Sequence, residues 1–370
     1  MARLSIEGLC KGWDFPVIDD LSIEVEEGEF FVIVGPSGIG KTSLLRLVAG
    51  LETPDRGTIR VGERDVTRLP PYRRRVAMTF ESYALYPHMT VAQNIASPLK
   101  ARGAPRDQID RRVAEVARLL RIDHLLARKP GEVSGGQKQR TALGRTLVAD
   151  PEVFLLDEPI SHLDAKIRHE LRAQFHTLED LRRVATVYVT HDYAEALALG
   201  DRIGVMGNGG RLVQVAGPRE LFENPATLFV AEHLGQPTIN VVPAELEEQD
   251  GRLVARAEQG WWSLPVPEAR RAALQPLKGR KVTLGLRPQH LRPQDELSHG
   301  VPVAGAVDIF EALGSTGVMI AEVEGVKLTA LTRPERHYEQ GEPVTLGLDA
   351  EAVHWFDPVD GRNLTAADHG

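Results

Sequence analysis

The sequence predicts an α/β domain over residues 1–235 followed by an all-β domain over residues 236–370. The first domain is indicated above all by residues 31–50, FVIVGPSGIGKTSLLRLVAG, where an apolar run leads through glycines into a helix with apolar period. The second is indicated by short β-rich segments between Gly and Pro residues. A chain of 370 residues is long enough to build two or three cores of this kind.

Composition narrows the classes of function. The net charge of −8 argues against a general nucleic-acid binder. The single cysteine, Cys10, excludes an internal disulfide, fits a reducing cytosol and is expected to be a small buried hydrophobe. We expect no secretory signal, because the N-terminus lacks a basic region followed by an apolar run. No run of eighteen apolar residues occurs, so we expect any membrane role to come through partner chains.

The glycine-rich stretch carries the clearest chemistry. It matches the phosphate-loop pattern G-x-x-x-x-G-K-[ST] in residues Gly35, Pro36, Ser37, Gly38, Ile39, Gly40, Lys41 and Thr42. Glycines let backbone N–H groups converge on phosphate oxygens, and the helix N-terminus adds a favourable dipole. Lys41 supplies a point charge for the β- and γ-phosphates, and the Thr42 hydroxyl is a Mg²⁺ ligand. An ordinary glycine turn is the alternative, but the strand and helix on either side favour nucleotide binding.

Other elements follow from periodicity. Strands are expected at 3–9, 21–26, 58–62, 75–80, 153–158 and 184–190, and helices at 91–101, 107–122 and from the 133–140 segment to about 149. Trp13 precedes the phosphate loop and either stacks on a base or packs in the core. The loop from Tyr83 to Met89 carries large apolar residues beside Pro87 and is expected to be a semi-exposed docking surface.

A second phosphate-binding helix end is expected at residues 133–140, VSGGQKQR. Ser134 is a helix cap by the simplest interpretation. The glycines that follow, with the helix dipole, also suit a phosphate group. One phosphate loop and a second phosphate-binding helix end in the same chain suggest two subunits that share a nucleotide.

Acidic residues end a buried strand at residues 153–158, VFLLDE. Asp157 is placed to hold Mg²⁺ through water, and Glu158 to orient or deprotonate an attacking water. Packing alone seldom explains paired acids at the end of a buried strand. Asp164 is expected to cap the next helix, and His191, at the end of another buried strand, to hydrogen-bond a γ-phosphate.

The chain changes texture after about residue 236. QPTINVVPAEL, residues 236–246, contains two prolines and resembles a linker. Short β segments are then expected at 252–257, 282–287, 302–310, 317–323, 326–331 and 344–348. Without a long amphipathic helix among them, a small β-barrel or sandwich is predicted.

Taken in order, GPSGIGKT, the aromatic loop, VSGGQKQR, VFLLDEP, a Leu-Asp turn and VTHD resemble the ATPase subunit of an ATP-binding cassette (ABC) transporter. That resemblance covers residues 1 to about 235. SYALYPHMTVAQNIASPL, DEPISHLDAKIR and ENPATLFVAEHLG are similar to the maltose-importer and carbohydrate-uptake group. LGLRPQHL and HWFDPVDGRNL resemble the C-terminal regulatory domain of that group, a pair of oligonucleotide/oligosaccharide-binding-like barrels, over roughly 237–370.

The resemblance implies roles for particular residues. Trp13 stacks on adenine, and Gly35 to Thr42 with Ser43 hold the triphosphate of ATP. Asp157 supports Mg²⁺, Glu158 is the general base and His191 the switch histidine. The nucleotide of the opposite subunit is met by Ser134, Gly135, Gly136 and Gln137, while Asp164 bridges the dimer. The Tyr83–Met89 loop faces a coupling helix of a membrane permease.

Two positions depart from the family pattern. Val133 opens the signature where leucine is usual, a mild change. Glu81 stands where the family has a glutamine that touches Mg²⁺ and the attacking water, so we place it with the catalytic and metal-binding residues. Its added negative charge suggests an asymmetric transporter whose second ATPase keeps the glutamine. The alternative is that Glu81 turns to solvent or pairs with an arginine among residues 73–75.

The resemblance therefore implies an ATP-hydrolysing importer subunit on the cytoplasmic face of the cell membrane, with uptake of a sugar, sugar derivative or polyol. Its expected partners are two integral-membrane permease subunits, a solute-binding protein and a second ATPase chain, identical or related, arranged head-to-tail. No nucleic-acid partner is expected. Alternatives are a polyamine, ferric iron, sulfate or molybdate importer, or a soluble ABC protein of translation or DNA repair. The last class usually has two cassettes or a coiled-coil insertion, and the sequence has neither.

Overall fold

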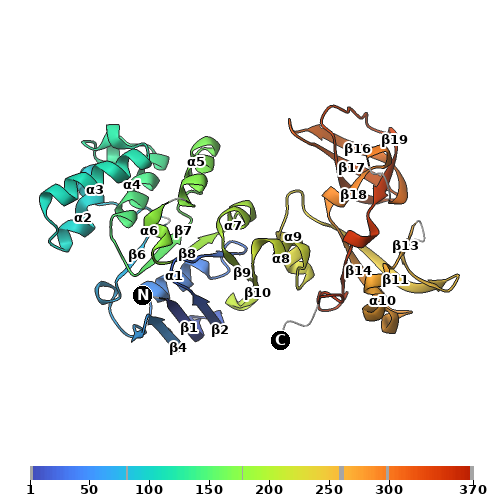
Figure 1. Ribbon diagram of the computed structural model, residues 1–370, viewed down its shortest axis with the longest axis horizontal. Helices are drawn as coiled ribbons and strands as arrows, with labels where there is room; N and C mark the ends of the chain where they lie inside the picture. Colours follow the sequence, from blue (N-terminus) through green and yellow to red (C-terminus); the bar gives the residue numbers. More distant parts are fainter. Residues whose placement is uncertain (1–2, 81, 177, 258–261, 297–299, 367–370) are drawn as a thin grey trace. The chain divides into compact units, whose positions relative to one another are not determined.

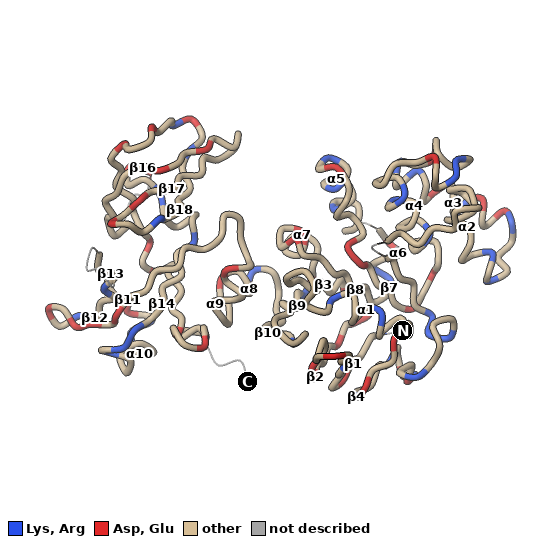
Figure 2. The backbone as a smooth tube through the Cα atoms, turned by 180° about the vertical axis from the view of Figure 1, so that it is seen from behind, with Lys and Arg blue, Asp and Glu red and all other residues tan. Residues whose placement is uncertain are grey.

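The chain divides into two units, Met1–Arg219 and Glu220–Gly370 (Figure 1). The computed structural model describes residues 3–80, 82–176, 178–257, 262–296 and 300–366. Within these residues, acidic and basic residues are interspersed along the backbone of both units (Figure 2). In the part of the chain so described, no helix combines the length and apolar character needed to cross a bilayer.

A six-stranded sheet forms the centre of the first unit, in the order β10-β9-β3-β8-β7-β6. Its strands are β3 (Phe30–Val34), β6 (Val76–Met78), β7 (Val153–Asp157), β8 (Ala185–Thr190), β9 (Arg202–Met206) and β10 (Leu212–Ala216). Only β10 pairs antiparallel with its neighbour. Every residue of β3, β7 and β8 is buried, as expected for parallel strands covered on both faces. The carboxyl ends of these three strands therefore meet at one edge of the sheet.

A smaller antiparallel sheet, β2-β1-β4-β5, shares its core with the central sheet and helix α1 (Lys41–Ala49). Its strands are β1 (Leu4–Gly12), β2 (Pro16–Val25), β4 (Arg56–Val61) and β5 (Arg64–Asp65). Alternation along β2 places Ile18, Leu21, Ile23 and Val25 in this core. The antiparallel sheet and the central strands therefore both pack with the phosphate-loop helix in one shared core.

Three helices, α2 (Val91–Ala101), α3 (Arg106–Leu119) and α4 (Gly135–Leu147), form a group beside the central sheet (Figure 1). The first has the bounds that the sequence predicted, because Thr90 and Gln93 form a capping box at its start. Helices α5 (Ala165–Phe175), α6 (Glu179–Arg182) and α7 (Tyr193–Leu199) complete the unit.

The second unit contains two five-stranded antiparallel sheets, in the orders β13-β12-β11-β14-β20 and β15-β19-β16-β17-β18. The first is built from β11 (Asn240–Gln249), β12 (Arg252–Ala257), β13 (Ser263–Pro265), β14 (Lys281–Leu286) and β20 (His354–Phe356). The second is built from β15 (Leu291–Pro293), β16 (Val301–Ala312), β17 (Gly317–Val323), β18 (Val326–Thr332) and β19 (Pro343–Leu348). Both sheets contribute to a single hydrophobic core. The all-β prediction is confirmed, with the short helix α10 (Glu268–Leu274) as an addition.

The linker predicted at residues 236–246 is wrong, because most of it belongs to β11, the middle strand of its sheet. Its side chains alternate between buried and exposed positions, with Val242, Ala244 and Leu246 in the core. The two prolines obscured this alternation. Pro243 is tolerated because the pairing with β12 begins only at the next residue.

The second unit begins earlier than the boundary expected at residue 235. Helices α8 (Pro218–Glu223) and α9 (Leu228–His233) lie around this boundary. Arg287, next to β14, donates hydrogen bonds to the carbonyl oxygens of Phe222 and Leu234. Its guanidinium also lies 3.7 Å from the centre of the Phe222 ring. These contacts tie residues after 219 to the β-rich unit.

We expect the first unit to bind nucleotide without the second, because every predicted phosphate contact precedes residue 192. A chain shortened to residues 1–219 should fold and bind MgATP with a Kd within a few-fold of the full chain, measured by calorimetry. The same shortened chain carrying Lys41→Ala is the matched control and should not bind. A folded, shortened chain that fails to bind ATP would contradict this separation.

Candidate nucleotide-binding site

The phosphate loop begins where β3 ends, and its backbone requires glycine at several positions. Gly38 and Gly40 have positive φ values of 78° and 111°. A Cβ atom on Gly35 would lie 2.5 Å from the carbonyl oxygen of Met206. The buried Lys41 Nζ donates to the carbonyl oxygens of Gly35 and Pro36, each at 2.8 Å. The loop thus curls around the lysine ammonium, which is the geometry of a phosphate cradle.

Thr42 and Asp157 approach each other across the sheet edge. The Thr42 hydroxyl lies 3.2 Å from Asp157 Oδ1, although the two residues come from α1 and β7. The backbone N–H of Asp157 donates to Thr79 Oγ1 at 2.8 Å, which fixes the end of β7. A hydroxyl and a carboxylate oxygen are hard donors that suit Mg²⁺, which usually keeps several waters and phosphate oxygens as further ligands. Within the described residues, no group of three or more His, Cys, Asp or Glu residues forms a protein-only metal site.

Glu158 follows β7 in an unusual backbone conformation, with a φ of 42°. Its N–H donates to the carbonyl oxygen of Val189 at 3.0 Å. Its own carbonyl oxygen accepts from Gln139 Nε2 at 3.0 Å and from Ser161 Oγ at 3.1 Å. The carboxylate Oε1 lies 2.9 Å from Nδ1 of His191, so the predicted base and the predicted switch histidine are brought together.

His191 is held by the turn between β8 and α7. The Thr190 hydroxyl accepts from the N–H of Asp192 at 2.9 Å and donates to Glu195 Oε2 at 3.0 Å. Glu195 also accepts from the buried Tyr188 hydroxyl at 2.9 Å, and burial raises the pKa of this carboxyl. The imidazole itself is half-exposed at the strand end, where it is open to a ligand.

The 133–140 segment begins α4 as predicted. Ser134 caps the helix, and Ser134 and Gln137 form a reciprocal capping box. Gly136 fits closely against the turn between β7 and α5, since a Cβ atom on Gly136 would lie 3.3 Å from Leu163. In that turn, Asp164 Oδ1 accepts from the N–H of Ile167 at 2.9 Å and caps α5. The predicted caps are confirmed, and contact with a second subunit's nucleotide stays a prediction.

Trp13 lies on the turn between β1 and β2 and is 56% exposed, which excludes the core-packing alternative. Lys11 Nζ lies 5.4 Å from the centre of its ring. Asp55 holds this turn, because its carboxylate accepts from Lys11 Nζ at 3.0 Å and from the N–H of Gly12 at 2.9 Å. The hydrogen bond from the Gly12 backbone contributes most to a lowered pKa of Asp55, and the one from Lys11 contributes next. The turn therefore presents an exposed aromatic ring.

The Tyr83–Met89 loop is partly exposed, as predicted, with Tyr86 46% exposed. Arg145 of α4 donates to the carbonyl oxygens of Tyr83 and Ala84, and its guanidinium lies 5.6 Å from the centre of the Tyr86 ring. Beside the loop is an open groove of about 540 Å³, lined in part by Met78, Phe80, Ala84, Tyr86, Pro98 and Ala101. Glu81 lies outside the described residues.

Several residues of the site escaped the sequence analysis. They share a role in holding loops rather than touching phosphate, and they are Asp55, Thr79, Gln139 and Arg145. Gln139 and Arg145 lie on α4, the helix that begins in the 133–140 motif, so their closeness to that motif was the signal that could have identified them. Asp55 bonds to residues 43 and 44 positions away, and Thr79 to one 78 positions away, separations that no local pattern reveals.

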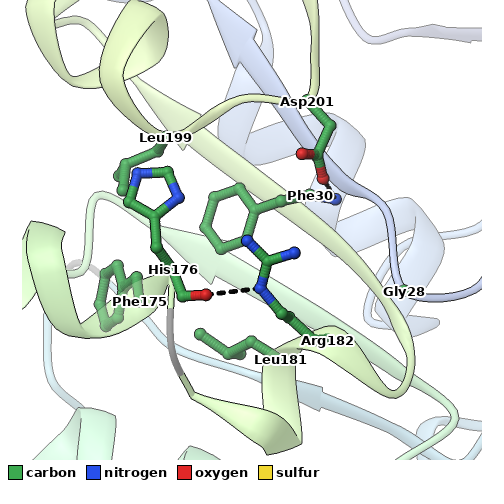
Figure 3. A pocket seen from close by; sticks show the side chains of 8 residues that line it. All are labelled: Gly28, Phe30, Phe175, His176, Leu181, Arg182, Leu199 and Asp201. Carbon is green, nitrogen blue, oxygen red and sulfur yellow. Dashed lines mark hydrogen bonds between the residues drawn. The ribbon is translucent and has the colours of Figure 1, made fainter.

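A small cavity lies at the opposite edge of the central sheet (Figure 3). Phe30, Phe175, His176, Arg182 and Asp201 are among its lining residues. Phe30 begins β3, whereas the phosphate loop follows its end, and Asp201 Oδ2 accepts from the N–H of Phe30. With a volume of about 10 Å³, the cavity has room for one water and not for a nucleotide.

Comparison with known families agrees with this geometry. Residues 18–161 match the family described as ABC transporter, residues 235–291 match the MalK OB fold domain, and residues 284–356 match the TOBE domain. The solved ATP-binding cassette MJ0796, a dimeric post-hydrolysis state bound to ADP and Pi, is similar with a TM-score of 0.54 and 26% identity. That similarity covers 58% of this chain and 99% of the other.

Two full-length relatives are closely similar. The sn-glycerol-3-phosphate import ATP-binding protein UgpC of Chromobacterium violaceum is 42% identical, covering 99% of this chain and 97% of the relative. The trehalose/maltose import ATP-binding protein MalK of Thermococcus litoralis is 44% identical, covering 94% and 95%. Both similarities therefore extend through the phosphate-binding unit and the β-rich unit.

We expect Trp13→Ala to weaken ATP binding, because an exposed aromatic face that stacks on a base contributes about 1–3 kcal/mol. The Kd should rise by roughly 5- to 150-fold, and Trp13→Phe should recover most of the loss. Phe15→Ala is the matched control, since Phe15 is 69% exposed on the same turn. Equal Kd values for Trp13→Ala and the unaltered chain, by nucleotide titration, would exclude stacking.

Proposed function

This chain belongs to the ABC transporter family of import ATP-binding proteins, and we propose that it powers uptake of a sugar, sugar derivative or polyol through partner permease chains. The observation that carries the proposal is the meeting of Thr42 with Asp157 and of Glu158 with His191 at one sheet edge, beside the Lys41 cradle. These are the groups that ATP hydrolysis requires in one place.

Each group has a distinct task in this proposal. Residues Gly35 to Ser43 bind the triphosphate of ATP, and the Lys41 ammonium offsets charge on its terminal phosphates. Thr42 and Asp157 hold Mg²⁺, which when bound neutralises charge that develops on the phosphates. Glu158 accepts the proton of the attacking water. His191, hydrogen-bonded to that carboxylate, orients it and contacts the γ-phosphate.

A second ATPase chain completes the site in this proposal. Ser134 and Gly135, at the N-terminus of α4, are exposed, so a phosphate group of another subunit can reach them. With Gly136, Gln137 and Asp164 they would complete the nucleotide site of the partner chain in a head-to-tail dimer. Two such chains, identical or related, would close over two ATP molecules.

The membrane partners are two permease subunits, which would bind at the Tyr83–Met89 loop and its groove. The groove presents apolar side chains such as Phe80, Tyr86 and Pro98 beside the Arg145 guanidinium. An amphipathic helix end with apolar residues and a carboxylate suits such a surface. The chain would then sit at the cytoplasmic face of the cell membrane.

The class of solute is supported by the relatives, whose names give sn-glycerol 3-phosphate and trehalose or maltose. Comparable identity to both leaves the choice between a phosphorylated polyol and a disaccharide to the permeases and a solute-binding protein. The complex of this chain with two membrane chains should take up one of these solutes into vesicles with ATP.

Glu158→Gln is the control for that experiment, because the amide keeps the shape of the side chain but cannot accept a proton. Loss of a general base lowers the rate by about 10²–10⁴, and the variant should accumulate as a closed, ATP-bound dimer. If the complex hydrolyses ATP but takes up none of the sugars and polyols, the proposed solute class is excluded. Hydrolysis at the unaltered rate in Glu158→Gln would exclude Glu158 as the base.

Glu81→Gln tests the departure at position 81. A unit charge about 4–5 Å from the γ-phosphate contributes roughly 3–4 kcal/mol at an effective dielectric of about 20, and Mg²⁺ attracts the same carboxylate. We therefore expect Glu81→Gln to reduce the dependence of turnover on Mg²⁺ in the purified complex. Arg74 and Arg75 are already engaged, with backbone carbonyls and with Glu152, which disfavours pairing of Glu81 with them. An unchanged Mg²⁺ titration would support the alternative, in which the charge faces solvent or pairs with an arginine.

A further inference from the structure

Gln139 reaches from the signature helix to the backbone of the predicted catalytic base. It lies in the second turn of α4 with only 4% of its surface exposed. Its Nε2 donates at 3.0 Å to the carbonyl oxygen of Glu158, which also accepts from Ser161 Oγ at 3.1 Å. Two side-chain donors from different elements thus converge on one backbone oxygen.

That oxygen belongs to a residue whose backbone needs support. The φ of 42° places Glu158 in the left-handed region, which is unfavourable for a side chain with a Cβ atom. Such a conformation persists only where the surroundings hold it. The orientation of this backbone sets the direction of the Glu158 side chain, and with it the 2.9 Å contact to His191.

The other polar atom of the Gln139 amide, Oε1, indicates that stability alone does not explain this residue. Its Oε1 is buried and has no hydrogen-bond partner among the described residues. A buried amide with one unsatisfied acceptor is a poor choice for stability, because an apolar side chain of the same shape avoids that desolvation cost. The single bond to the Glu158 carbonyl is therefore the feature that an apolar residue cannot supply.

We propose that Gln139 is a positioning residue, which holds the backbone of Glu158 so that its carboxylate is aimed at the attacking water. This inference rests on the proposed function, because it takes Glu158 as the general base. Gln139 is two residues from Gln137, which in that function meets the nucleotide of the opposite subunit.

The test is Gln139→Met in the full chain within its transporter complex, since methionine keeps the length of the side chain and removes the donor. We expect kcat to fall by roughly 10- to 100-fold, as for a misplaced catalytic group, with the KM and Kd for ATP within about twofold. In a Glu158→Gln background the same substitution should cause no further loss. A merely structural role would lower stability and nucleotide binding together and would act in both backgrounds.

Two further variants keep the result interpretable. Thr186→Val removes a buried hydroxyl from β8, one that bonds to the carbonyl oxygen of Leu181, and should leave kcat unchanged. Ser161→Ala removes the second donor from a surface turn and should lower kcat several-fold, which tests the inference even if Gln139→Met does not fold. Unaltered kcat in Gln139→Met or, should that variant not fold, in Ser161→Ala, while Glu158→Gln is inactive, would overturn the inference and leave the proposed function intact. Hydrolysis that survives in Glu158→Gln would instead overturn the assignment of the base, and the inference with it.

Discussion

The left-handed backbone at Glu158 is the constraint on which the arrangement of the candidate site depends. Strand β7 is buried along its whole length, so it must deliver both Asp157 and Glu158 within two residues of leaving the core. An extended backbone would send these two side chains to opposite faces of the sheet. The turn at Glu158 instead leaves Asp157 beside Thr42 and Glu158 beside His191. Its strain, of order 1–3 kcal/mol, is offset by four hydrogen bonds to the backbone N–H and carbonyl of Glu158, each worth about 0.5–1.5 kcal/mol.

Helix α4 connects the separate parts of this site. Its N-terminus is capped by Ser134, its second turn carries Gln139, and Arg145 near its end holds the loop at Tyr83 and Ala84. Burial lowers the pKa of Arg145, and the charge is compensated by carbonyl oxygens and the Tyr86 ring. One helix therefore carries the predicted second phosphate-binding end and contacts both the backbone of Glu158 and the loop beside the groove. The residues that α4 contacts, Glu158 on one side and Tyr83 and Ala84 on the other, lie in distant segments of the sequence, and the helix connects them.

The sequence was sufficient where chemistry is local. The phosphate loop, the acids at the end of β7 and the histidine after β8 were each predicted at the end of a buried strand, and the parallel pairing of β3, β8 and β7 brings these ends together. It was insufficient where contacts are remote. The bond of Gln139 to Glu158 joins residues 19 apart, and Thr79 supports Asp157 from 78 residues away. Strand β11 was missed for a different reason, because a proline seldom lies inside a central strand. Pro243 is accommodated since the pairing of β11 with β12 begins only at Ala244.

Arg287 shows why the helices near residue 220 belong with the β-rich unit. Burial lowers the pKa of this guanidinium to about 10, which is still above neutral pH, so the group remains charged. Its charge is met by the carbonyl oxygens of Phe222 and Leu234 and by the Phe222 ring. A buried cation with these partners is costly to separate from them, because both the charge and the carbonyls would be left unsatisfied. The contacts of Arg287 therefore place α9 and the end of α8 with the β-rich unit, ahead of the proline-containing segment that first suggested a linker.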